Sequence, residues 1–219
     1  MKSISYTYFL LCLPILFSCN TEERVSREVF DNVKRESAVK RISEVQIVEK
    51  ALAMGNEISD EAQEQLMSTL QNAIEENGLV GALNFCQAEA LPIVKSTGSD
   101  YGVEIRRVSN RFRNPADQPK ADEEVLLGAY EYNHEAGIAS EPNIQKLQNG
   151  EVLLYTRAIT IPGQLCLNCH GDISTDVPAD VADTIDQLYP EDKAKGHKVG
   201  ELRGMWAIRI PRKEVISRL

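Results

Sequence analysis

The spacing of apolar residues predicts a first half of the chain that is mainly helical. From about residue 22 to 54, apolar residues recur every three to four positions without Gly or Pro, which is the pattern of an amphipathic helix. The stretch "GNEIS" interrupts that pattern, and Ser59 then offers an N-cap for a second helix that runs to "EENG". A third helix is expected from Leu79, with Pro92 bending or ending it.

Apolar runs in the second half predict strands. "GEVLLYTRAITI" and "LRGMWAIRIP" are the strongest candidates, and "GVEIRRVS" is a third. The prolines of "RNPADQPK" cannot continue a strand, and helices are expected over 121–134 and 181–188. Helices followed by a mixture of strands and helices predict an α+β fold, in which helices pack on an antiparallel sheet after a long N-terminal helix.

The first residues, "MKSISYTYFLLCLPILFSCN", are typical of an export signal. Their apolar block covers residues 8–17, which is far below the roughly 20 residues of a membrane-spanning helix. The ending "LFSC" resembles the lipobox of bacterial lipoproteins, in which Cys19 would carry the lipid; an ordinary signal peptide is the alternative. We therefore expect an exported protein on the periplasmic side, anchored by its lipid to a bacterial membrane.

The predicted organisation has three parts: a lipoprotein signal peptide over 1–18, a lipidated N-terminus with a long helix over 19–57, and a domain over 58–219. The net charge of −9 argues against a nucleic-acid partner, because phosphates require Lys and Arg. Of the five cysteines, Cys12 leaves with the signal and Cys19 takes the lipid. Three remain, which is an odd number in a compartment that permits disulfides.

The stretch "GQLCLNCHGDIS" carries the main candidate chemistry, with Cys166, Cys169 and His170 within five positions. The spacing Cys-x-x-Cys-His is that of covalent haem attachment, in which two thioethers hold the haem and the histidine binds its iron. Zinc is an alternative but needs two further ligands, and a redox dithiol would leave His170 incidental. Because an exported chain meets oxidising conditions, the sequence favours one covalent haem c.

Three stretches together resemble a family of bacterial c-type haem domains. They are "FCQAEA", "RRVSNRFRNP" and "CLNCHG" preceded by "LLYTRAITI", and the resemblance runs from about residue 60 to 211. This family occurs as a single-domain cytochrome in cyanobacteria and as a sensor module joined to signalling proteins. The resemblance implies a PAS-like fold, with the haem domain over 58–219.

The resemblance also implies a sixth iron ligand, because the cysteine of the family's "FC" motif binds the iron and Cys86 matches it. From the residues alone, Cys86 is equally a ligand or a small buried side chain on the apolar face of a helix. A second histidine is the runner-up. His134 and His197 both stand among polar residues, which favours a surface position for each.

The haem propionates need cationic partners, and arginine can form two parallel hydrogen bonds with one carboxylate. The stretch "RRVSNRFR" is rich in arginine, although strand alternation sends Arg106 and Arg107 to opposite faces. Arg113 belongs to "RNP", which the related family keeps near the cofactor. We predict Arg107 and Arg113 as partners, with a solvated basic stretch as the alternative.

The expected function is electron transfer at low potential, because a thiolate ligand and a negative net charge both stabilise ferric iron. The alternative is redox or gas sensing through a separate partner. No acid–base pair is evident beside the haem and two strong ligands leave no open site, so we do not expect an enzyme. The redox or signalling partner is not specified by the sequence.

Overall fold

The computed structural model describes residues 26–36 and 42–219. Cys19 and the predicted signal peptide lie outside these residues. The chain divides into two units, 1–41 and 42–219, and the first contains the described helix α1 (Arg27–Glu36). The second unit contains every other described element, in the order α2 (Glu44–Tyr101), β1 (Glu104–Val108), η1 (Pro115–Asp117), α3 (Ala121–Glu135), β2 (Asn143–Leu147), η2 (Gln148–Gly150), β3 (Val152–Thr160), α4 (Gln164–His170), α5 (Ala179–Leu188), β4 (Leu202–Pro211) and α6 (Arg212–Ile216).

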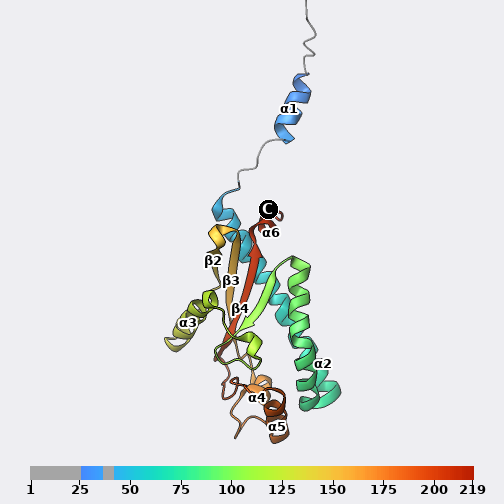
Figure 1. Ribbon diagram of the computed structural model, residues 1–219, viewed down its shortest axis with the longest axis vertical. Helices are drawn as coiled ribbons and strands as arrows, with labels where there is room; N and C mark the ends of the chain where they lie inside the picture. The colour runs from blue at the N-terminus through green and yellow to red at the C-terminus, as the bar shows by residue number, and fades with distance from the viewer. Residues whose placement is uncertain (1–25, 37–41) are drawn as a thin grey trace, which may run out of the picture. The chain divides into compact units, whose positions relative to one another are not determined.

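The second unit is built on one antiparallel sheet, with the strand order β1-β4-β3-β2 (Figure 1). This confirms the predicted α+β class and the predicted strands β1, β3 and β4. The edge strand β2 was not predicted, because "NIQKL" is largely polar and exposed. The PAS-like relationship stays a prediction. In the described part of the chain, no helix is both long and apolar enough to cross a membrane.

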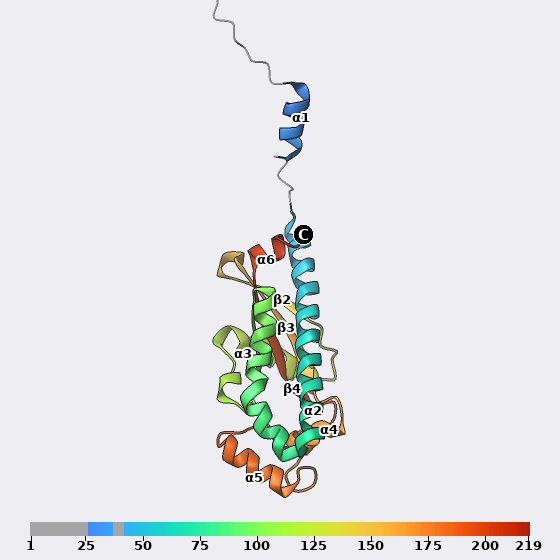
Figure 2. The ribbon, with the colours of Figure 1, turned by 90° about the vertical axis from the view of Figure 1, so that its right-hand side faces the viewer.

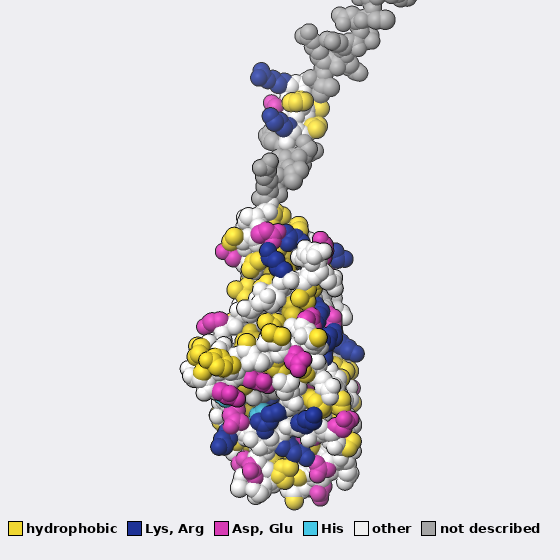
Figure 3. Space-filling view, turned by 60° about the vertical axis from the view of Figure 1, so that its left-hand side comes forward, with side chains coloured by type: hydrophobic (Ala, Val, Ile, Leu, Met, Phe, Trp, Pro, Cys, Tyr) yellow, Lys and Arg dark blue, Asp and Glu magenta, His cyan; other side chains and the backbone are white. Residues whose placement is uncertain are grey.

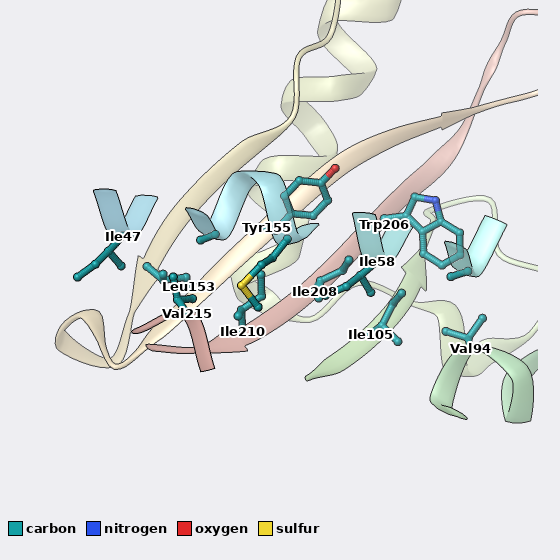
Figure 4. Close-up of a cluster of buried hydrophobic side chains, with 13 residues drawn as sticks. Ile47, Ile58, Val94, Ile105, Leu153, Tyr155, Trp206, Ile208, Ile210 and Val215 are labelled. Carbon is teal, nitrogen blue, oxygen red and sulfur yellow. The ribbon is translucent and has the colours of Figure 1, made fainter. Parts of the chain in front are cut away.

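Helices cover both faces of the sheet. On one face, residues of α2 pack against Tyr155 and Trp206, and Figure 4 shows this cluster around Ile58 and Ile208. On the other face, α3 packs Leu127 and Tyr130 against alternate residues of the same strands. Because β3 and β4 are buried on both sides over most of their length, their sequences are largely apolar, and this made them easy to predict.

The long helix α2 corrects two predictions. It begins at Glu44 behind the N-cap Ser43, whose backbone is extended, so a single continuous helix over 22–54 is wrong, although residues 27–36 and 44–54 are helical. It also continues through "GNEIS" without a break. Gly55 is there because Tyr155 packs directly on it: a Cβ at this position would lie 2.1 Å from Tyr155 Cδ2. The glycine serves a close approach between helix and sheet and does not end the helix.

The turn in α2 lies at Gly78, whose φ of 68° and ψ of −177° are not helical. The two arms run side by side (Figure 2), with Thr97 Oγ1 donating to Gln65 Oε1 at 3.0 Å. Pro92 does not end the second arm, which continues to Tyr101 and buries Val94. Apolar contacts on this arm therefore outweigh the hydrogen bond that the proline lacks.

The first turns of α2 belong to the compact domain. Ile47, Ala51 and Met54 are part of its main core, and the second unit begins at Ile42. The compact unit therefore begins ahead of residue 58, where the sequence analysis placed the start of the haem domain. Residues 44–57 are a structural part of the domain and not a stalk that leads to it.

Gly55→Ala is expected to lower the free energy of unfolding by about 1–3 kcal/mol, because the new methyl group overpacks the contact with Tyr155. Gly128→Ala in α3 is the matched control. Its Cβ meets nothing within 4 Å, so the same change should stabilise the helix by roughly 0.5–1 kcal/mol. Urea denaturation measures both. Equal effects of the two substitutions would contradict the close packing at Gly55.

Candidate functional site

A single cavity brings together all six site residues predicted from the sequence for the domain. It is lined by both arms of α2 near the bend, by the ends of the central strands, by α4 and by Tyr189 after α5. The helices α4 and α5 are at the lower end of Figures 1 and 2. Its walls are largely apolar and include Leu66, Leu70, Ile74, Leu83 and Ile161. The predicted residues that line it are Cys86, Arg107, Arg113, Cys166, Cys169 and His170.

Three thiols border this cavity. Cys166 and Cys169 lie one turn apart on the short helix α4, and Cys86 comes from the second arm of α2. All three are partly buried and unpaired. Burial raises the pKa of each thiol, although the charges of Arg107 and Arg113 partly oppose this at Cys86. The cavity alone therefore favours neutral thiols, which need a cation or a covalent partner to lose their protons.

The structure fixes the tautomer of His170. Its Nδ1 lies 3.0 Å from the carbonyl oxygen of Ala194, which can only accept a hydrogen bond, so Nδ1 carries the proton. Nε2 is left with a lone pair. Burial, followed by the charges of Arg113 and Arg203, lowers the pKa of His170 well below its ordinary range. A neutral imidazole whose second nitrogen donates to a backbone carbonyl is the usual arrangement of a metal-binding histidine.

The end of α4 is held by a segment that we call the clamp loop, residues 192–197. The last carbonyl groups of a helix lack partners within it, and here three consecutive ones find them outside. Arg113 Nη2 donates to Cys169 O at 2.5 Å, and the backbone amides of His197 and Gly196 donate to the oxygens of His170 and Gly171. Arg113 also forms an ion pair at 3.2 Å with Asp192, whose side chain is almost fully buried.

Arg113 is therefore engaged mainly with the protein, whereas Arg107 faces the cavity. In the described part of the chain, no hydrogen bond or ion pair occupies the guanidinium of Arg107. Arg203 from β4 lines the cavity beside it, and burial, with the charges of Arg107 and Arg113, lowers the pKa of Arg203 to about 10. Arg106, on the opposite face of β1, pairs with the buried Glu123 of α3 at 2.6 Å. The polar end of the cavity thus carries positive charge that attracts an anion.

The other two histidines do not line the cavity. His134 is exposed, as expected, but His197 is buried rather than at the surface. Arg111 Nη1 lies 3.1 Å from its Nδ1, so Nδ1 accepts and Nε2 carries the proton. Burial, followed by the charges of Arg111 and Arg203, lowers the pKa of His197 to about 4. The rings of His197 and His170 pack edge to face, with 6.3 Å between their centroids. The backbone amide of the same His197 donates to the carbonyl oxygen of His170.

Sequence reasoning missed three residues of this site. Arg203 lies within a predicted strand, Asp192 lies in a polar loop, and Asp117 lies in the proline-rich turn η1. Arg203 could have been found from the sequence, because it stands near the end of a strand that is buried on both faces. A charged side chain in such a place needs polar partners. Asp192 offered no signal, because only the folded loop brings it to Arg113.

Fold and site define a small α+β domain whose cavity combines thiols, a neutral histidine and arginines. Residues 33–211 match the model of the Tll0287-like family, and the chain belongs to this family. It is similar to the crystal structure of the cyanobacterial heme-protein Tll0287, with a TM-score of 0.50 and 29% sequence identity over 73% of this chain and 94% of that one. A search of curated proteins found no match.

Arg113→Met is expected to lower the free energy of unfolding by about 3–5 kcal/mol, because it removes the nearer cation of the buried Asp192 carboxylate and leaves only Lys195, at 3.9 Å. Lys120→Met is the control: it removes the pair with Glu104, in which both side chains are about half exposed, and should cost less than about 1 kcal/mol. Chemical denaturation of both variants measures the difference. A loss at Arg113 as small as at Lys120 would contradict the role of the clamp loop.

Proposed function

We propose that this protein is an exported c-type haem protein, anchored to a bacterial membrane by a lipid on Cys19, that transfers electrons at low potential. The observation that carries the haem assignment is the composition of one cavity. This cavity has largely apolar walls. It is also lined by Cys166, Cys169 and His170, by the thiol of Cys86, and by the guanidinium of Arg107. The family membership supports it, since a solved structure similar to this chain is that of a cyanobacterial heme-protein.

The residues fit a covalently held haem in several independent ways. Cys166 and Cys169 border the same cavity and would form the two thioethers. His170 presents a deprotonated Nε2, which would bind iron. The apolar walls suit a flat apolar macrocycle, and Arg107 and Arg203 would receive its anionic propionates. When bound, the haem supplies one-electron redox chemistry, while the protein supplies ligands, orientation and charge.

Arg113, which the sequence suggested as a propionate partner, is better suited to a positioning role. Its guanidinium is engaged by Asp192 and by the carbonyl oxygen of Cys169. It would hold the attachment segment and leave Arg107 as the freer of the two predicted cations.

Cys86 is the proposed sixth ligand. It lines the cavity from α2, whereas His170 enters from α4, so the two come from different walls. His134 and His197 do not line the cavity, which argues against the alternative of two histidine ligands. Zinc is also disfavoured, because the described residues contain no group of three or more His, Cys, Asp or Glu side chains arranged for a metal ion.

A thiolate ligand and a net charge of −9 both favour ferric iron and hence a low reduction potential. This supports electron transfer rather than enzyme catalysis. Redox or gas sensing is the second candidate function, and it also depends on Cys86 as an iron ligand. An anionic thiolate binds ferrous iron less strongly than ferric iron. Its release on reduction would open a site for carbon monoxide or nitric oxide.

Purified, exported protein is expected to contain one haem that stays with the polypeptide when it is denatured and extracted with acidified organic solvent. A pyridine haemochrome assay, read with ferric and ferrous absorption spectra, identifies and counts it. Cys166→Ala together with Cys169→Ala should abolish covalent retention. Haem that passes into the organic phase from the unsubstituted protein, or stoichiometric zinc without haem, would contradict the proposal.

Cys86→Ala should remove the thiolate signature from the ferric spectrum and raise the reduction potential, while covalent haem retention stays unchanged. Asn84→Ala, at an exposed position two residues earlier on the same helix and outside the cavity lining, is the control and should leave the ferric spectrum intact. An unchanged ferric spectrum in Cys86→Ala would exclude Cys86 as a ligand. Carbon monoxide binding to the ferrous form separates the two functions: no binding would argue against gas sensing.

A further inference from the structure

A carboxylate lies at the polar end of the cavity without a direct partner. Asp117 ends the turn η1, where its amide donates to Asn114 O and its carbonyl oxygen accepts from Ser109 N, each at 2.9 Å. The backbone at this position is therefore fixed. Its side chain lines the cavity, and no hydrogen bond or ion pair joins it to any side chain of residues 26–36 or 42–219.

Charged groups from several elements surround Asp117. Burial raises the pKa of this carboxyl, and arginine charges from β1 and β4 oppose the shift. Tyr189, which follows α5, also interacts with it, and burial raises the pKa of that phenol. The ionisable groups that face Asp117 or share its cavity are Arg106, Arg107, Arg203, Tyr189, Arg113, Cys86, Cys166, Cys169 and His170.

The balance of charge in this cavity changes when haem is bound. Arg106 is engaged by Glu123, and Arg113 is engaged by Asp192. Arg107 and Arg203 are the two remaining cations of the polar end, and two propionates would match their charge. Asp117 then adds a further negative charge in a desolvated place. An added electron raises the proton affinity of nearby carboxylates, because like charges in a poorly solvated site repel strongly.

We propose that Asp117 takes up a proton from solvent when the bound haem is reduced, so that electron transfer in this protein is coupled to proton transfer. The inference rests on the proposed haem function. A one-electron donor, which is the redox partner in the cell and dithionite in the test, supplies the electron that converts ferric to ferrous iron. One O–H bond forms as the carboxylate becomes a carboxylic acid, so the total charge of the cavity does not change.

The test is the midpoint potential measured by spectroelectrochemistry from pH 4 to pH 9. Reduction raises the pKa of Asp117, so the potential should fall as pH rises between the ferric and ferrous pKa values. That window lies above about 4, the ordinary pKa of an aspartate. Within it, the reduction equilibrium should change by up to tenfold per pH unit, equivalent to 59 mV for one electron.

Asp117→Asn is nearly isosteric and should make the potential independent of pH in that window. Glu89→Gln is the charge-matched control, because it removes one negative charge from an exposed position on the same helix as Cys86. It should leave the pH dependence intact. A pH dependence that persists in Asp117→Asn would assign the proton to another group, such as the Cys86 thiol, and overturn the inference, as would a flat response in the unsubstituted protein.

A second measurement does not require the variant to fold. The redox-induced infrared difference spectrum of unsubstituted protein labelled with ¹³C-aspartate should show a protonated aspartic acid band that appears on reduction. Its absence would overturn the inference. The haemochrome assay is run first on the same sample, so that a missing haem reports failure of the proposed function and a present haem with no proton uptake reports failure of this inference alone.

Discussion

The site depends above all on how the protein holds the end of the short helix α4. Three consecutive carbonyl groups there point away from the helix and are bonded by the Arg113 guanidinium and by two amides of the clamp loop. A helix of seven residues cannot fix its own last turn. The buried pair of Arg113 with Asp192 therefore sets where Cys169 and His170 lie, and the Ala194 carbonyl in the same loop sets which nitrogen of His170 is free.

The helix α2 connects this site to the rest of the fold. Its first arm packs on the sheet through Ile47 and Ile58, and its second arm returns from the turn at Gly78 to form a wall of the cavity that carries Cys86. Leu83 on that arm packs against Val181 and Ile185 of α5, in a small cluster apart from the main core. The arrangement of the two arms thus decides the separation between Cys86 and the α4 segment.

The surface around the cavity lobe is mixed in charge. Figure 3 shows Lys and Arg side chains on the lower part of one face with Asp and Glu among them. Pairs of opposite charge also occur beside the cavity lobe: Lys195 pairs with Asp186, and Arg111 lies 3.9 Å from Glu201. Inside the cavity, the two positive charges of Arg107 and Arg203 exceed the single carboxylate charge of Asp117, an excess that would favour the binding of an anion.

Much of the fold followed from the sequence because burial on two faces leaves largely apolar segments, as in β3 and β4, and because the sequence marks both ends of α3. Gly55 led to the wrong prediction of a helix end. Only the folded structure shows that this glycine allows Tyr155 to pack closely on the helix. The segment that holds Cys166, Cys169 and His170 was evident from its local spacing. The clamp loop was not, because Arg113 and Asp192 meet only in the folded chain, and the polar neighbours of His197 gave no sign that it is buried.

The central claim is that α2 and α4 supply the two axial ligands of a haem in one cavity, a sulfur from Cys86 and a nitrogen from His170. Iron K-edge absorption spectroscopy of the ferric protein tests it most directly, since the extended fine structure separates sulfur from nitrogen neighbours of the iron. The account predicts one sulfur and five nitrogens, four of them from the macrocycle. A first shell of nitrogen alone would contradict it.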